Sequence, residues 1–160
     1  MKPIFAAAIP SLAAAALFVT LAARAQQPAA PQGQAAPAAE PYRPSLSDIM
    51  AQQQRRHIKL WYAGHAGNWP LASYEIGELS DGFDDVGDML GGDTVQKMIG
   101  AQLAEVQKAI ADKDESAFTQ AFDGLTADCN NCHHLLDHGF IVIQQPVQLP
   151  YSDQSFAPQK

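Results

Sequence analysis

The sequence predicts an all-α fold, an antiparallel bundle of four helices that run up, down, up and down. Apolar residues recur at alternating spacings of three and four along residues 45–140, which is the rhythm of helices that pack one face on a partner. Short polar or glycine-rich stretches divide this region into four segments of about twenty residues each. The period-two alternation of a half-buried strand is not seen, so no sheet is expected.

The first helix is expected to begin at Ser45 or Ser47, either of which can cap it, and to end at the glycines of AGHAGN. Its buried stripe comprises Ile49, Met50, Gln53, His57, Leu60 and Trp61. Asn68 is expected to cap the second helix, which ends at the glycine pair 91–92. The second stripe comprises Ala72, Ile76, Leu79, Phe83, Val86 and Leu90.

The third helix starts near Asp93 or Thr94, and the turn ADKDES separates it from the fourth helix, for which Asp114 is the expected cap. The third stripe comprises Val95, Ile99, Gln102 or Leu103, Val106 and Ile110. The fourth stripe comprises Phe118, Phe122, Leu125, Cys129, Cys132 and Leu136. Both cysteines of the chain are therefore expected on the buried face of the last helix.

The two ends of the chain differ from the helical region in composition. Residues 1–25 carry a lysine, an alanine-rich apolar run and an Ala-Arg-Ala sequence, a pattern typical of a cleaved secretory signal peptide. An uncleaved membrane anchor is the alternative, but the run contains a proline. We expect bacterial export to the periplasm and no stable membrane insertion after cleavage. Residues 26–44, rich in Ala, Pro and Gln, are expected to form a disordered linker, and residues 141–160 an extended C-terminal tail.

The chain is acidic. It carries 10 basic and 17 acidic side chains, a net charge of −7. Removal of the signal peptide takes away Lys2 and Arg24 and leaves 8 basic against 17 acidic side chains, a net charge of −9. Such a surface repels phosphates, so nucleic acid is not an expected partner. The charge could steer a basic protein partner, although solubility alone is the simpler interpretation.

The only two cysteines stand three positions apart in CNNCHH, and His133 follows the second. A disulfide across so short a loop constrains the unfolded chain little. A zinc site needs about four ligands, and a thioredoxin-like site needs strands. Covalent haem uses the whole pattern, because two thiols bond the vinyl groups on one edge of the ring and the adjacent imidazole reaches the iron. We therefore predict one haem c, with Cys129 and Cys132 as thioether anchors and His133 as proximal iron ligand, while His134 faces outward.

A helical bundle with CNNCH near the end of its last helix resembles the cytochrome c′ family and its low-spin relatives. The resemblance covers residues 45–140. It implies that the first helix supplies the residue on the other side of the iron. In relatives where that residue is a methionine the protein carries electrons, and in relatives where it is apolar the iron binds gases such as NO. Bundle cytochromes of this type often dimerise, so a homodimer is one expectation.

Two donors on the first stripe could face the iron, Met50 and His57. Counting from the turn shared by two antiparallel helices, at about 1.5 Å per residue, puts Met50 within about 8 Å of the level of His133 and His57 about 18 Å away. We therefore expect Met50 as distal ligand, with an open site as the alternative.

Ligation by histidine and methionine suits electron transfer. The expected function is an exported mono-haem c-type cytochrome that exchanges electrons with a redox partner protein. The alternative is a five-coordinate protein that binds NO or another diatomic gas. An enzyme such as a peroxidase is not expected, because no distal acid–base group is placed beside the predicted haem.

Residues 55–75 hold two tryptophans, two tyrosines and two histidines. We expect Trp61 and Trp69 to seal one end of the bundle and His57 to form a hydrogen bond there. The alternative is a docking surface or a second metal site formed by His57 and His65.

Overall fold

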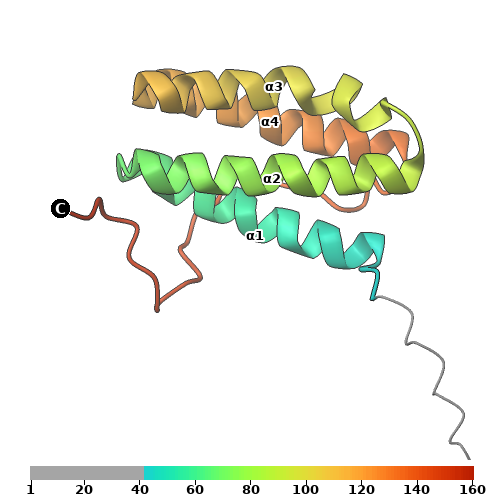
Figure 1. The fold of residues 1–160 in the computed structure, drawn as a ribbon, viewed down its shortest axis with the longest axis horizontal. Coiled ribbons are helices and arrows are strands. Elements are labelled where there is room, and N and C mark those ends of the chain that lie inside the picture. Colours follow the sequence, from blue (N-terminus) through green and yellow to red (C-terminus); the bar gives the residue numbers. More distant parts are fainter. Residues whose placement is uncertain (1–41) are drawn as a thin grey trace, which may run out of the picture. The chain divides into compact units, whose positions relative to one another are not determined.

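The computed structural model describes residues 42–160, which form four helices and no strand (Figure 1). The helices are α1 (Leu46–His65), α2 (Trp69–Leu90), α3 (Thr94–Asp112) and α4 (Glu115–Leu135). The all-α fold predicted from the sequence is thereby confirmed. The predicted signal peptide, residues 1–25, and residues 26–41 of the predicted linker lie outside the described residues.

Three of the helices begin at capping side chains that the sequence predicts. Ser45 forms a capping box with Asp48, in which the Ser45 Oγ accepts from the Asp48 N–H at 3.2 Å and the Asp48 carboxylate accepts from the Ser45 N–H at 3.0 Å. Asn68 accepts from the Leu71 N–H, and Asp114 accepts from the N–H of residue 117. Asp93 precedes α3 without a capping hydrogen bond from its side chain.

The helices bury one face each in a common core. Helix α1 packs along α2, α2 along α3 and α3 along α4. Helices α1 and α4 approach each other at fewer positions. The largest fully buried side chains include Leu60, Leu79, Ile99, Val106, Phe118, Phe122 and Leu125. The expected stripe position Leu90 is wrong, because this side chain is 39% exposed at the last residue of α2.

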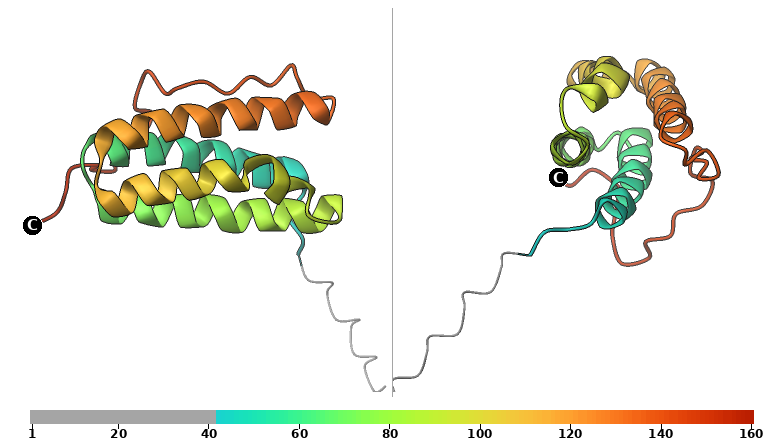
Figure 2. Two further views of the ribbon diagram at one scale, coloured as in Figure 1. Left: turned by 90° about the horizontal axis from the view of Figure 1, so that it is seen from above. Right: turned by 90° about the vertical axis from the view of Figure 1, so that its right-hand side faces the viewer.

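The chain after α4 returns along the bundle (Figure 2). Its Tyr151 ring lies 5.1 Å from the Lys59 ammonium of α1, and its Phe156 packs with a ring centroid 5.9 Å from that of Tyr62. Phe156 is only 7% exposed and belongs to the hydrophobic core. The tail is therefore packed against the domain and contributes to its stability.

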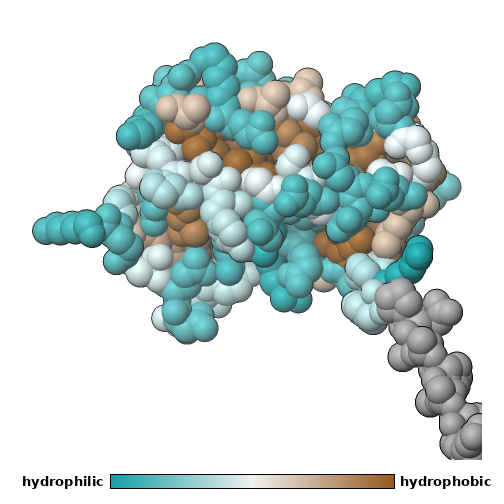
Figure 3. Space-filling model, in the orientation of Figure 1, coloured by the Kyte–Doolittle hydropathy of each residue, from teal (hydrophilic) through white to brown (hydrophobic). Residues whose placement is uncertain are grey.

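The face of the molecule seen in Figure 3 is mostly hydrophilic, and apolar residues show in separate patches between polar ones. Across the described residues, several exposed large apolar side chains come from the end of α4 and the segment after it: Leu135, Phe140, Ile141, Val142, Val147 and Leu149. Within residues 42–160, no helix has the length and apolar character needed to cross a membrane.

Candidate functional site

The two cysteines lie in the last two turns of α4, where both side chains are partly buried and neither is in a disulfide. Residues three apart on a helix lie on neighbouring positions of one face, so both thiols belong to the same side of α4. Cys129 packs against the hydrophobic core, as its stripe position predicts. Burial raises the pKa of the Cys129 thiol to about 12 and also raises the pKa of Cys132. Both groups are therefore protonated thiols at neutral pH.

His133, directly after Cys132, is fixed through one ring nitrogen. Its Nδ1 lies 2.9 Å from the carbonyl oxygen of Ile141. A carbonyl oxygen only accepts hydrogen bonds, so Nδ1 carries the proton in this pair. In the neutral imidazole this leaves Nε2 without a proton and with its lone pair free, which is the state that a metal ligand requires.

The end of α4 brings Ile141 to this position. The N–H of His138 donates to the carbonyl of His133 at 2.7 Å, and the N–H of Asp137 donates to the carbonyl of His134 at 3.3 Å. Asp137 has a φ of 60°, in the left-handed region. These are the features of a Schellman motif, which ends the helix and reverses the chain. The segment that follows therefore lies back against α4, beside His133.

Asn130 holds the same segment one helical turn earlier. Its Oδ1 accepts from the Ile143 N–H at 2.7 Å, and its Nδ2 donates to the Ile143 carbonyl oxygen at 2.9 Å. Asn131, its neighbour between the cysteines, is exposed, and its Nδ2 lies 3.5 Å from Asp128 Oδ1. The spacing in CNNCH does not distinguish these two asparagines, and the structure does.

Met50 and His57, the two candidates for the other side of an iron, lie on α1. Met50, in the second turn, is partly buried and packs against the hydrophobic core. Gln53, one turn further, is buried, and its Nε2 donates to the Leu79 carbonyl oxygen at 2.8 Å. The structure thus brings Cys129, Cys132 and His133 together on one stretch of α4 and places Met50 on a different helix.

His57 has a structural hydrogen bond. Its Nε2 lies 2.8 Å from the hydroxyl oxygen of Thr126 on α4, and that hydroxyl donates to the Phe122 carbonyl oxygen at 2.9 Å. Because the Thr126 proton is used in this way, His57 is the donor to Thr126. The side chain is 4% exposed, and burial lowers the pKa of His57 to about 4. His57 is therefore a neutral donor that joins α1 to α4.

Aromatic residues at the end of α1 and the start of α2 form a cluster at one end of the bundle. The Trp61 ring lies 4.8 Å from Phe122 and 3.8 Å from His65, measured between centroids. Trp69 lies 6.2 Å from Phe118, which is fully buried. These contacts fit the sealing role expected for the two tryptophans. Among the described residues, no group of three His, Cys, Asp or Glu side chains is placed to hold a metal ion.

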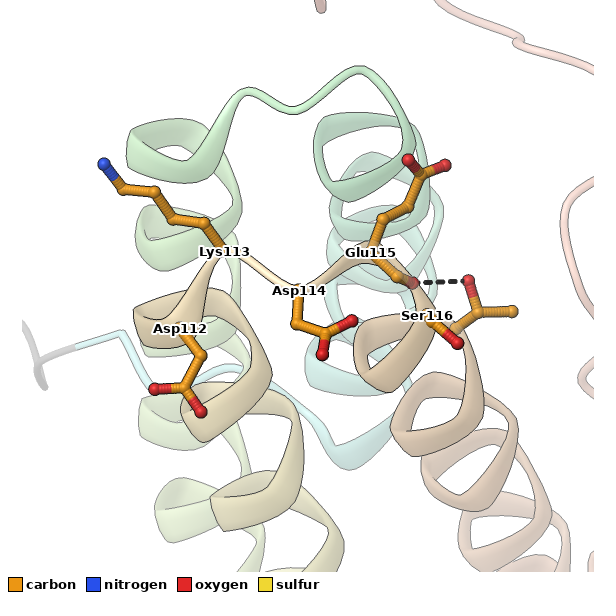
Figure 4. Close-up of a pocket in the computed structure, with 6 residues that line it drawn as sticks. Asp112, Lys113, Asp114, Glu115 and Ser116 are labelled. Carbon is orange, nitrogen blue, oxygen red and sulfur yellow. Dashed lines mark hydrogen bonds between the residues drawn. The ribbon is translucent and has the colours of Figure 1, made fainter.

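Two hollows in the surface are lined by residues other than the cysteines. One is at the turn between α3 and α4, lined by Asp112, Lys113, Asp114, Glu115, Ser116 and Thr119 (Figure 4). The labelled side chains point in different directions, and the turn lies at the opposite end of α4 from Cys129. A second hollow lies between α1 and α2, where Asp48, Glu78, Asp81 and Asp85 line it. Neither arrangement converges on a reacting centre, whereas the end of α4 holds two free thiols and an adjacent imidazole.

Comparison with protein-family models, curated proteins and solved structures finds no match for this chain.

Proposed function

We propose that this protein is an exported mono-haem c-type cytochrome that carries electrons through a haem iron ligated by histidine and methionine. One haem c would be bonded to Cys129 and Cys132, with His133 as the proximal ligand. The observation that carries the proposal is the state of these residues on α4: two free thiols precede an imidazole whose Nε2 is left for a metal. The haem would supply the redox-active iron, and the chain would hold it and set its potential.

The proposal places this site in an up-down-up-down bundle. Contacts between helices support antiparallel neighbours, because residue numbers that rise along one helix fall along the next. Gln53 bonds to Leu79, and Arg56 to Glu75. Between α1 and α4 the successive contacts are His57 with Thr126, Trp61 with Phe122 and His65 with Phe118.

The contact between His57 and Thr126 supports Met50 as the distal ligand. Met50 precedes His57 by seven residues on α1, and His133 follows Thr126 by seven residues on α4. At 1.5 Å per residue, antiparallel helices then carry both residues to the same level, about 10 Å from the contact. His57 lies at the level of the contact itself, with its Nε2 already bonded to Thr126.

The chemistry of these residues suits a carrier. A thioether ligand opposite an imidazole raises the reduction potential relative to two imidazoles. The acidic composition would favour a redox partner protein with a basic surface. The role needs no catalytic residue, and we propose none.

Expression of the full chain in a bacterium, with and without a haem c maturation system, tests the proposal. We expect covalent haem on a denaturing gel and the mass of a mature chain whose first residue is Gln26. A Cys129→Ser, Cys132→Ser double variant should lose the haem, and His134→Ala should keep it. Absence of covalent haem from the wild-type protein would contradict the proposal.

The optical spectrum of the purified protein tests the carrier role separately. We expect a low-spin spectrum in both oxidation states and, in the ferric state, a methionine-to-iron charge-transfer band at the red end. A high-spin spectrum that shifts on addition of NO or CO would overturn the carrier role and establish a gas-binding haem protein.

A further inference from the structure

We infer that the segment after α4 is a strap that positions the iron-binding imidazole, and that Asn130 is the clamp that holds this strap. The strap comprises residues 137–145. The inference rests on the proposed haem c function and adds three residues to it: Asn130 as a positioning residue, Ile143 as its backbone partner, and Ile141 as the acceptor for His133.

The clamp uses both halves of one side-chain amide. Asn130 accepts from the Ile143 N–H and donates to the Ile143 carbonyl oxygen, at 2.7 and 2.9 Å. Both backbone groups of one tail residue are thereby satisfied by one side chain, as they would be by a neighbouring strand. Such a pair fixes the position of Ile143 and the direction of the chain through it.

The geometry of the clamp determines where the carbonyl of Ile141 lies. Asn130 and His133 are three residues apart on α4 and therefore occupy neighbouring positions on one face. Ile141 precedes Ile143 by two residues along the tail and meets His133 Nδ1 at 2.9 Å. The other end of the strap begins at the His133 backbone, whose carbonyl accepts from the His138 N–H. His133 is therefore contacted by the strap through both its backbone and its ring.

One further contact holds the far end of the strap. Gln145 donates from Nε2 to a carboxylate oxygen of Asp123, nearly two turns before Asn130 on α4. The strap is thus attached to α4 at three levels, and the clamp is the middle one. A change at Asn130 should loosen the part of the strap that carries Ile141 while the other attachments keep the tail near the helix.

The consequence for a haem would be electronic. A hydrogen bond from Nδ1 to a carbonyl orients a ligating imidazole and makes it a stronger donor. A stronger donor stabilises the ferric state and lowers the reduction potential. Loss of the clamp should therefore raise the potential and expose the Nδ1 proton to exchange with solvent.

The two asparagines between the cysteines form a matched pair for the test. In the holoprotein expressed from the full chain, Asn130→Ala should raise the reduction potential and speed the exchange of the His133 Nδ1 proton, which NMR measures. The amide of Ile143 should exchange at least about tenfold faster, because its N–H loses its acceptor, Asn130 Oδ1, and the Ile143 carbonyl loses its donor, Asn130 Nδ2. Asn131→Ala, at the exposed position, should leave all three readouts at their wild-type values. Ile143→Pro removes the donor to Asn130 without changing the motif. It should reproduce the shifts in the reduction potential and in the His133 Nδ1 exchange if Asn130→Ala does not fold.

The outcomes separate the strap from the haem. If both Asn130→Ala and Ile143→Pro kept covalent haem, the wild-type reduction potential and the wild-type His133 Nδ1 exchange, the strap would be overturned. Equal shifts in Asn130→Ala and Asn131→Ala would also overturn it, because the effect would then belong to the motif in general. Absence of covalent haem from the wild-type chain would overturn the proposed function and the positioning of a ligand with it. Exchange at Ile143 would still show in that apoprotein whether Asn130 holds the tail.

Discussion

His57 donates a hydrogen bond from Nε2 to the hydroxyl of Thr126 at 2.8 Å, inside the contact between α1 and α4. Both side chains are buried, and the His57 ring also packs 4.3 Å from the Phe122 ring, between centroids. Protonation of this imidazole would place a charge among buried groups. The pair therefore links the stability of the bundle to pH.

The stability of the protein should fall as the pH is lowered through the range between 6.5 and about 4. Burial lowers the pKa of His57 from 6.5 to about 4, so the unfolded chain binds this proton first. The stability that the neutral His57 contributes is complete above pH 6.5 and is lost as the pH falls to the folded pKa; it amounts to about 3 kcal/mol.

Denaturant unfolding at several pH values checks this expectation, with His57→Gln as the variant without a titrating ring. As the pH is lowered from 6.5 to about 4, the free energy of unfolding should fall more steeply in the wild type than in His57→Gln. His65→Gln, an exposed position on the same helix, serves as the control and should keep the wild-type slope. Identical slopes in the wild type and His57→Gln would contradict the assignment.

A second polar contact, which is partly buried, joins α1 to α2. Arg56 Nη1 lies 3.1 Å from Glu75 Oε2, and the Glu75 side chain is 1% exposed. Burial raises the pKa of Glu75, and the adjacent guanidinium opposes that shift. Arg56→Met should destabilise the protein by about 3 kcal/mol, because it leaves a buried carboxylate without its partner.

The loss of stability in Arg56→Met should become smaller in acid, where Glu75 is protonated in both the wild type and the variant. Arg55→Met, an exposed neighbour, should change the free energy of unfolding by less than about 0.5 kcal/mol. Thermal or chemical unfolding at neutral and acidic pH measures both quantities. Equal stabilities of the two variants would show that the ion pair is dispensable.

The helices could be predicted from the sequence because their signals are local. Caps at Ser45, Asn68 and Asp114 and apolar spacings of three and four depend only on nearby residues. The same spacing placed Cys129 against the core. Leu90 was misplaced because a stripe position at the end of a helix is buried only if a neighbour covers it.

The rest of the site depends on contacts between distant residues. Thr126 lies outside the predicted apolar stripe, and only the packing of α1 on α4 shows that it receives the hydrogen bond of His57. The tail has no helical period, and its backbone carbonyl at Ile141 leaves no mark in the side-chain pattern. The haem, Met50 as a ligand and the electron-carrier function remain predictions.

Close packing of α1 on α4 yields a third prediction. A Cβ added at Gly64 would overlap the ring of Phe118, whereas one added at Gly77 of α2 would meet no atom within 4 Å. Gly64→Ala should therefore destabilise the protein by about 1–3 kcal/mol, because the added methyl group overlaps a ring that is fully buried in the core. Gly77→Ala should stabilise it by about 0.5–1 kcal/mol through helix propensity.

Chemical unfolding of the two alanine variants, made in the same chain, measures this difference. Stabilisation by both substitutions would indicate that helix propensity decides and that Gly64 is not a packing position.

The last prediction concerns Met50. If Met50 ligates the haem iron, Met50→Ala should abolish the methionine-to-iron charge-transfer band, produce a high-spin spectrum and lower the reduction potential. Met98 of α3 is the matched control, because it is also partly buried against the hydrophobic core. Met98→Ala should lose a similar amount of packing while leaving the spectrum and the potential of the wild type.

The comparison separates ligation from packing, because both variants remove a thioether and leave a smaller side chain in the same core. Addition of CO to the reduced proteins is a second test of the same difference. CO should bind readily to Met50→Ala, where the distal position is open, and slowly to the wild type and Met98→Ala. An unchanged spectrum in Met50→Ala would show that the methionine only packs. Its level opposite His133, set by the contact between His57 and Thr126, would then have no bearing on the iron.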